Sequence, residues 1–320
     1  MLAAEVGATP SGVVEGAMGC LRHPPSGALQ PLDVTTTVGR APGCALLLDA
    51  SFVSAEHASV RWNGDRWVLR DLGSRNGTWL DGAAITVGDP HPLRAGSELS
   101  FGAPDHTWVL EDASPPTPWA SSRGRLVRGS LDLLALPDAE APEQVAYRLA
   151  DGSWAIEHAG AVTPVRHLDR VTVHGVEYTL HLPVHVAPTT DAPQAAHTAS
   201  DLALTFRVSR DEEHVEVEGR LGQRVLDLGS RSHHYLLLVL ARRRLGERHD
   251  GEDDEAAGWV HALELCDMLK VDDSAVNLQV FRARKQLAKH GVPGAARLVE
   301  RRPDSRELRI GVGELEVHRL

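Results

Sequence analysis

The chain has 320 residues, a formal net charge of -11 and 42% hydrophobic residues, which fits a globular protein with room for two or three domains. Its three cysteines, Cys20, Cys44 and Cys266, are too few and too scattered for a disulfide framework or a zinc site, so we expect a reducing compartment and no metal. No apolar stretch approaches membrane-spanning length, and no basic region precedes an apolar core at the N-terminus, which predicts a cytoplasmic protein without a membrane partner.

The first predicted domain, residues 18–113, contains a succession of short strands. Apolar and polar side chains alternate, as in half-buried strands, in residues 32–38, 58–62, 67–71, 80–87 and 98–101. Glycines between these segments are turn signals. Many short strands at regular spacing predict an all-β sandwich.

Polar residues lie in three loops between these strands. Arg40 begins the loop after the first strand, Ser54 lies at the entrance of the next strand, and Asn76-Gly77 is a tight-turn signal in a third loop. Such loops would surround one phosphate from three sides. A guanidinium offers a phosphate two parallel donors, which lysine does not.

The same residues resemble the motif of a forkhead-associated (FHA) domain, which binds phosphothreonine. The motif consists of Gly39-Arg40, Ser54, His57 and the run Ser74-Arg75-Asn76-Gly77-Thr78. The resemblance implies that Arg40 and Ser54 hold the phosphate and that Asn76 contacts the peptide backbone. Many relatives have a basic or polar residue where this chain has Ala55. Two outcomes of this departure remain open, a weaker affinity for phosphate and compensation by Arg75. The residues expected to support the loops are Gly39, His57, Gly77 and Thr78.

The middle of the chain, residues 122–186, is predicted to be a small β-rich module of unknown role. Segments near residues 151–156 and 171–180 are similar to strands of the first domain, but no Ser-x-Asn-Gly-Thr loop lies between them. Two interpretations remain open, a degenerate partial repeat and a loop-rich extension of the first domain. A linker rich in Pro, Thr and Ala follows at residues 187–200.

The last predicted domain, residues 201–320, combines strands with three helices. Strands are expected at residues 204–208, 214–217 and 225–228, with Ser230 as a helix N-cap. The first helix carries Leu236, Leu237, Leu240 and Ala241 at helical spacing, and a second helix is expected at residues 261–270. Residues 298–310 are typical of a hairpin turning at Pro303-Asp304-Ser305.

Residues 276–287 read VNLQVFRARKQL and resemble the recognition helix of the winged-helix output domain of bacterial response regulators. The apolar residues Val276, Val280, Ala283 and Leu287 share one face of this helix. The resemblance implies an α+β winged helix-turn-helix that contacts double-stranded DNA from the third helix and the hairpin. The residues expected to contact DNA are Gln279, Arg282, Lys285, Gln286, Lys289, Arg301, Arg302 and Arg306.

Local charge supports this prediction. Residues 274–309 contain nine Lys or Arg and three acidic residues, a balance of 9 - 3 = +6 in a chain of net charge -11. Arginine and glutamine are natural partners of guanine and adenine in the major groove. The surrounding acidity predicts modest non-specific affinity with strong salt dependence, and a homodimer on paired half-sites would raise that affinity.

The remaining motifs indicate no catalysis. The acidic run at residues 247–255 matches no calcium loop and is typical of a disordered, solvated insertion. No phosphate-cradling glycine loop, zinc signature or nucleophile elbow occurs, so we expect neither an enzyme nor a cofactor.

The sequence therefore predicts a multidomain bacterial transcription regulator: an FHA-type sandwich, a β-rich module and a winged helix. A Ser/Thr kinase or one of its substrates would present the phosphothreonine, and Thr189 or Thr190 of the linker is a second candidate ligand. The alternative is a phospho-dependent signalling adaptor whose winged helix binds protein rather than DNA.

Overall fold

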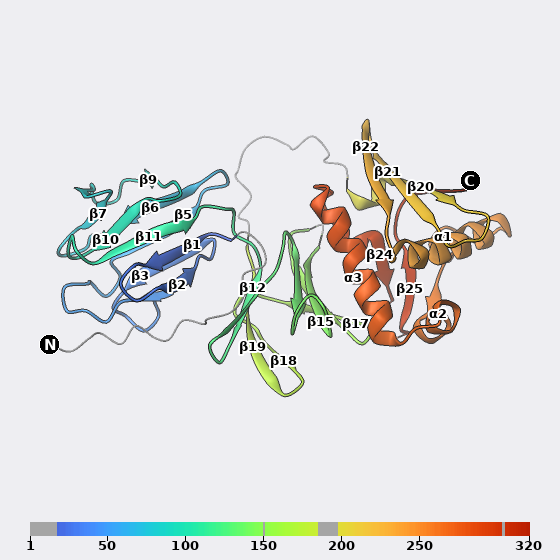
Figure 1. Cartoon of the computed structure of the whole chain (residues 1–320). Helices are drawn as coiled ribbons and strands as arrows, with labels where there is room; N and C mark the ends of the chain where they lie inside the picture. The colour runs from blue at the N-terminus through green and yellow to red at the C-terminus, as the bar shows by residue number, and fades with distance from the viewer. Residues whose placement is uncertain (1–17, 150, 185–197, 303–304) are drawn as a thin grey trace. The chain divides into compact units, whose positions relative to one another are not determined.

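The computed structural model describes residues 18–149, 151–184, 198–302 and 305–320 (Figure 1). The chain forms two compact units. The first comprises residues 1–130 and 177–185, and the second comprises residues 131–176 and 186–320. Residues 131–176 thus belong to the second unit, although the segments on both sides of them in the sequence belong to the first.

The first unit contains a sandwich of two β-sheets, drawn in blue through cyan to green in Figure 1. One sheet has the order β2 (Ala28–Pro31), β1 (Cys20–His23), β11 (Thr107–Asp112), β10 (Glu98–Phe101), β7 (Thr78–Leu80) and β8 (Ala83–Ala84). The other has the order β4 (Leu46–Leu47), β3 (Thr35–Gly39), β5 (Ala58–Trp62), β6 (Trp67–Asp71) and β9 (His91–Pro92). The predicted all-β sandwich is confirmed, although the strand expected at residues 80–87 is broken into β7 and β8 by a turn at Asp81 and Gly82.

Alternation of side chains explains the core of this sandwich. In β5 the side chains of Ala58 and Val60 are fully buried, while Arg61, which points to the opposite face of the strand, is exposed. Leu69 and Leu99, from opposite sheets, have no exposed surface and belong to the same cluster. The two sheets therefore bury one shared apolar layer and leave their connecting loops at the ends free for binding.

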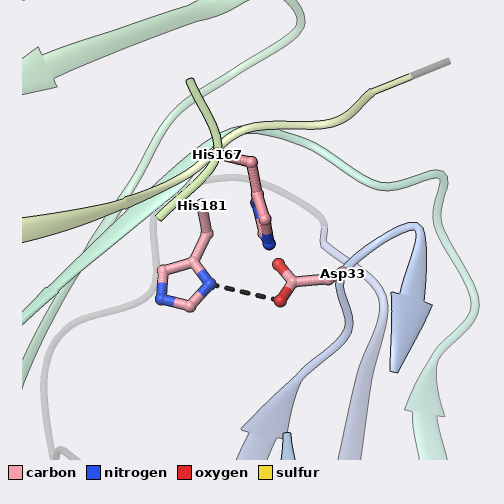
Figure 2. Close-up of side chains that lie close together, drawn as sticks. All are labelled: Asp33, His167 and His181. Carbon is pink, nitrogen blue, oxygen red and sulfur yellow. Dashed lines mark hydrogen bonds and ion pairs between the residues drawn. The ribbon is translucent and has the colours of Figure 1, made fainter. Parts of the chain in front are cut away.

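Three more strands belong to the first unit: β12 (Trp119–Ser122), β13 (Arg125–Arg128) and β19 (Val176–His181), which pair in antiparallel fashion. Asp33, which precedes β3, joins them to the sandwich. Its carboxylate accepts a hydrogen bond from Trp119 Nε1 at 3.1 Å. The carboxylate also lies 3.2 Å from His181 Nδ1, the contact that is dashed in Figure 2. The rings of Trp119 and His181 stack with centroids 3.4 Å apart.

The second unit begins with a four-stranded antiparallel meander. Its order is β14 (Leu133–Leu136), β15 (Gln144–Arg148), β16 (Trp154–His158) and β17 (Ala161–Val165). We call these four strands the middle sheet. β18 (Arg170–Val173) follows them along the chain.

The rest of the second unit consists of sheets and helices. The 3-10 turn η1 (Ala199–Asp201) precedes a sheet of β22 (Arg224–Ser230), β21 (Val215–Leu221), β20 (Leu202–Val208) and β26 (Glu314–Arg319). A smaller sheet has the order β23 (Val260–His261), β25 (Glu307–Ile310) and β24 (Val299–Arg301). The helices are α1 (His234–His249), α2 (Ala262–Leu269) and α3 (Asp273–Lys289), and the 3-10 turn η2 (Ala295–Leu298) precedes β24.

Local capping sets the helix boundaries. α1 begins after His233 rather than Ser230, because Ser230 is the last residue of β22. His261 caps α2 by accepting a hydrogen bond from Leu263 N at its Nδ1 atom, and Asp272 caps α3 by accepting one from Ala275 N at 2.7 Å. The three predicted helices are all present, with boundaries shifted by a few residues.

Two faces of α3 are buried. The predicted apolar face of Val276, Val280, Ala283 and Leu287 is confirmed, with exposed fractions of at most 2%. A second buried face carries Phe281, Arg284 and Ala288. The sequence did not predict this second face.

The middle sheet packs into the same core as α3. Leu133, Val145 and Tyr147 of the middle sheet belong to one apolar cluster with Phe281 and Ala288. Each large side chain that is fully buried contributes about 1.5–3 kcal/mol. We therefore describe the middle sheet and the C-terminal elements as one folding unit.

This arrangement differs from the predicted domain boundaries. The β-rich segment 122–186 is not a separate body, since β12, β13 and β19 belong to the first unit and β14–β17 to the second. Periodicity finds strands but not the sheet that each strand joins. Most of the predicted linker at 187–200, including Thr189 and Thr190, lies outside the described residues, as do Pro303 and Asp304 of the predicted hairpin turn.

The acidic run at residues 247–255 is not the detached insertion that its composition suggested. The Asp254 carboxylate lies 3.0 Å from Arg244 Nη2 and also pairs with Arg248. Arg244 is 4% exposed and donates further hydrogen bonds to Ile310 O and Val312 O. Because a buried guanidinium needs a counter-charge, Asp254 fixes this run to α1.

None of the helices in the described ranges has both the length and the apolarity needed to cross a bilayer.

Candidate functional site

The loops after β3 and before β5 lie side by side in the first unit. Arg40 N donates to Ser54 O at 2.9 Å, and Ala41 N donates to Ala55 O at 2.9 Å. The Arg40 side chain is exposed, and its Nε donates to Val53 O at 3.3 Å. Within the described part of the chain this is its only side-chain hydrogen bond, so both terminal nitrogens remain available to a ligand.

The third loop, between β6 and β7, is attached to the second. Arg75 N donates to Ser54 Oγ at 3.0 Å, and Asn76 Nδ2 donates to Phe52 O at 2.8 Å. The Ser54 hydroxyl therefore uses one acceptor position and keeps its own proton to donate. The Asn76 amide keeps its oxygen and one N–H. Arg75 and Asn76 are both exposed.

His57 lies beneath these loops and has no exposed surface. Its Nδ1 accepts from Ser54 N at 3.1 Å, and its Nε2 donates to Gly77 O at 2.9 Å. These partners fix the neutral tautomer protonated at Nε2. Burial lowers the pKa of His57, although the hydrogen bond to Gly77 opposes this shift. The imidazole thus links the second loop to the third without carrying charge.

Asp71, at the end of β6, holds the third loop. Its buried carboxylate accepts from Gly73 N and Ser74 N at 2.8 Å, and from Ser74 Oγ and Thr78 Oγ1 at 2.5 Å. Burial alone would raise the pKa of Asp71, but these hydrogen bonds outweigh burial and lower it. From sequence, Asp71 was predicted only as part of a strand. The spacing of Asp71, Ser74 and Thr78 was the signal that could have revealed it.

Two glycines are required by the loop geometry. A Cβ atom on Gly39 would lie 2.2 Å from Ala55 O, so only glycine lets the first two loops approach so closely. Gly77 has a φ of 88°, which is strained for any residue with a side chain. The residues predicted to support the loops, Gly39, His57, Gly77 and Thr78, all lie beneath or within them.

The three loops therefore present a guanidinium, a hydroxyl and a carboxamide on one hydrogen-bonded framework. Arg75 adds a second exposed guanidinium beside them. Such a set of donors suits a dianionic phosphate next to an extended backbone.

The predicted DNA-contacting residues on α3 are unequally exposed. Arg282 and Lys289 are exposed, while Gln279 and Lys285 are half-buried. The Lys285 ammonium lies 5.8 Å from the centre of the Phe281 ring. The free surface of α3 is therefore basic and centred on Arg282 and Lys289.

Gln286 is not free to read a base. Its Oε1 accepts from His233 Nε2 at 2.7 Å and from His234 Nε2 at 2.9 Å, while its Nε2 donates to Leu228 O at 2.7 Å. Both imidazoles must carry a proton on Nε2 to make these bonds. Gln286 thus ties α3 to the start of α1 and the end of β22.

We expect this cluster to make the second unit less stable in acid. Burial is the main cause that lowers the pKa of His233 from 6.5 to about 4. Burial also lowers the pKa of His234. The pKa of His233 is lower in the folded than in the unfolded protein. Its neutral form therefore contributes stability that is fully present above pH 6.5 and is lost as the pH falls towards 4. We expect the free energy of unfolding to fall by about 2 kcal/mol from His233 alone between pH 7 and pH 5.

Urea unfolding of the full chain at both pH values measures this effect. His233→Gln keeps an amide donor but does not titrate, and should reduce the pH dependence of the free energy of unfolding by about 2 kcal/mol. An unchanged pH dependence in this variant would show that His233 does not titrate in this way.

The predicted arginines of the hairpin are largely engaged within the protein. Arg301 has a side chain that is only 3% exposed and pairs with Glu157, so it does not lie on a surface that DNA could contact. Arg302 stacks over Trp259 at 4.3 Å and pairs with Glu307 at 3.0 Å. Arg306 pairs with Asp273 at 3.2 Å and is 42% exposed. The spacing of basic residues did not reveal these acidic partners.

The sandwich and its three loops define the class of the N-terminal domain. Residues 36–102 match the family model described as the FHA domain. These residues form an FHA domain.

Known proteins match parts of the chain. FHA domain-containing protein FhaB of Mycolicibacterium smegmatis is 40% identical over 58 residues, which cover 18% of this chain and 37% of the relative. Glycogen accumulation regulator GarA of the same organism is 35% identical over 82 residues, covering 25% of this chain and 50% of the relative. Among solved structures, Mycobacterium tuberculosis EmbR in complex with a low-affinity phosphopeptide is 27% identical, with a TM-score of 0.28, covering 31% of this chain and 25% of that chain. The chain thus spans at most about half the length of these relatives.

Proposed function

We propose that the protein is a phosphothreonine-dependent transcription regulator. Its FHA domain would bind a phosphothreonine of a Ser/Thr kinase or kinase substrate. The observation that carries this proposal is the continuous hydrogen-bonded framework of three loops, in which Arg40, Ser54 and Asn76 keep free donors. Arg40 would form two parallel hydrogen bonds to the phosphate, Ser54 would donate its hydroxyl proton, and Asn76 would bind the peptide backbone.

We further propose that residues 201–320 act as a winged helix that binds double-stranded DNA. The order of elements supports this: three helices are followed by the hairpin of β24 and β25, and α3 carries the exposed cations Arg282 and Lys289. Lys285 is a third cation on the same helix, while Arg302 and Arg306 would contribute from the hairpin. Because Arg301 and Gln286 are engaged inside the unit, we leave them out of the proposed contacts.

The DNA proposal is tested by titrating the full protein with genomic fragments at several salt concentrations. If about three phosphates are contacted, log affinity should fall against log salt with a slope near -2.7. Arg282→Ala should weaken binding and reduce the steepness of this slope by about 0.9. Arg297→Ala, an exposed arginine in η2, is the matched control and should bind like wild type.

One observation favours a second candidate, a signalling adaptor that binds protein through the same domain. Several of the expected DNA-contacting cations already have acidic partners, Arg301 with Glu157, Arg302 with Glu307 and Arg306 with Asp273. If wild type shows no salt-dependent binding to DNA, and Arg282→Ala gives the same titration as wild type, the result would support the adaptor proposal and contradict the DNA proposal.

A further inference from the structure

A buried ion cluster joins the middle sheet to α3 and to the β24–β25 hairpin. Glu157 of β16 is 7% exposed, and its carboxylate lies 3.0 Å from Arg284 Nη1 of α3. The same carboxylate pairs with Arg301 of β24. Glu157 and Arg284 are 127 residues apart in the chain.

The two arginines also join α3 and β24 directly. Arg284 Nη2 donates to Val299 O at 2.6 Å, and Arg301 Nη2 donates to Asn277 Oδ1 at 2.7 Å. These reciprocal bonds place two buried guanidinium groups side by side. Glu157 is the acidic group that pairs with both, so it offsets their mutual repulsion.

Tyr147 of β15 completes the cluster. Its ring lies 5.2 Å from the Arg284 guanidinium carbon, in cation–π geometry. Burial lowers the pKa of Arg301, and the Glu157 carboxylate opposes that shift. The geometry of the cluster thus depends on a charge supplied by the middle sheet.

We propose that Glu157 is a positioning residue of the DNA-binding surface. Its carboxylate holds α3 and the β24–β25 hairpin at one relative angle, which makes residues 131–176 part of the DNA-binding unit. The inference rests on the proposed DNA-binding function of α3. Apolar contacts of the shared core hold these elements together, whereas the ion cluster, which requires directed hydrogen bonds, selects one arrangement.

The test compares full-length wild type with Glu157→Gln, which keeps the shape of the side chain and removes its charge. Two quantities are measured under conditions in which every variant is folded by circular dichroism: affinity for a DNA fragment, and hydrogen exchange of backbone amides. We expect Glu157→Gln to raise the Kd by about tenfold and to speed exchange in α3 and β24 by a similar factor. Glu157→Asp keeps the charge on a shorter side chain, so its Kd and its exchange rates should lie between those of wild type and Glu157→Gln. It takes the place of Glu157→Gln in the comparison if Glu157→Gln does not fold.

Leu204→Ala is the matched control. Leu204 lies in β20 and is 1% exposed in the same core, so its truncation destabilises the unit without removing the ion cluster. We expect this variant to keep wild-type affinity when folded and to speed exchange in β20 and β21 instead. A merely structural role for Glu157 would leave the affinity of folded Glu157→Gln at the wild-type value, as expected for Leu204→Ala.

The outcomes separate the two proposals. Wild-type affinity and wild-type exchange of α3 and β24 in Glu157→Gln would overturn the positioning role. If wild type itself binds no DNA at any salt concentration, the proposed function fails, and faster exchange confined to α3 and β24 would still establish Glu157 as the residue that fixes these elements.

Discussion

Replacing Arg40 with alanine should abolish most of the affinity for phosphothreonine peptides. The exposed guanidinium has two terminal nitrogens without a partner in the described residues, and the loop beneath it is fixed by the bonds of Arg40 N and Nε. Losing a bidentate, charge-assisted contact costs about 2–4 kcal/mol, which corresponds to a rise in Kd of roughly 30-fold to 1,000-fold. Fluorescence anisotropy with a labelled phosphothreonine peptide library measures this change.

Two controls make the Arg40 result specific. Arg66→Ala removes another exposed arginine, which pairs with its neighbour Asp65 in the β5–β6 turn, and should leave the Kd unchanged. Arg40→Lys keeps the charge but not the forked donors, so its Kd should lie between those of wild type and Arg40→Ala. Equal affinity of wild type and Arg40→Ala, or equal binding of phosphorylated and unphosphorylated peptides, would contradict the proposed phosphate contact.

Replacing Asp71 with asparagine should destabilise the FHA domain and weaken peptide binding together. The carboxylate accepts hydrogen bonds from two backbone amides and from the hydroxyls of Ser74 and Thr78. An amide nitrogen cannot accept, so at least one buried donor loses its partner, at a cost of about 2–3 kcal/mol. We expect that loss in the free energy of unfolding by urea, followed by tryptophan fluorescence, and about a tenfold rise in peptide Kd.

Asp65→Asn is the corresponding control. Its side chain is 72% exposed, and its ion pair with Arg66 lies at the surface, so its replacement should change stability by less than about 0.5 kcal/mol. If Asp71→Asn unfolds at the same urea concentration as Asp65→Asn, the assigned role of Asp71 is wrong.

The sequence allowed much of the first unit to be predicted because its signals are local. Alternating side chains predicted β5 and β6, and Asn76-Gly77 indicated the loop before β7, where Gly77 has a positive φ, although residues 72–77 form a longer loop than the predicted tight turn. The buried face of α3, from Val276 to Leu287, followed from helical spacing in the same way. Each of these features depends on residues only a few positions apart.

The unpredicted features depend on partners distant in sequence. Arg301 carries the basic side chain expected of a DNA contact, and nothing near it indicates that Glu157 pairs with it. Gln286 similarly looks like a base-reading residue until His233 and His234 are placed beside it. Polar residues on a helix are therefore ambiguous from sequence alone, since a buried hydrogen-bond network and a nucleic-acid surface use the same side chains.

The position of residues 131–176 in the sequence, far ahead of the helix they pack against, has a consequence for biosynthesis. The strands β14–β17 leave the ribosome before their packing partner α3, whose last residue follows Val176 by 289 - 176 = 113 positions. At about 5–20 residues per second, these 113 positions alone take roughly 6–23 seconds, so Leu133, Val145 and Tyr147 wait at least that long for their partner. The FHA sandwich can fold during this interval, whereas the nascent middle sheet keeps its apolar side chains exposed. We therefore expect chaperones to bind the middle sheet during translation.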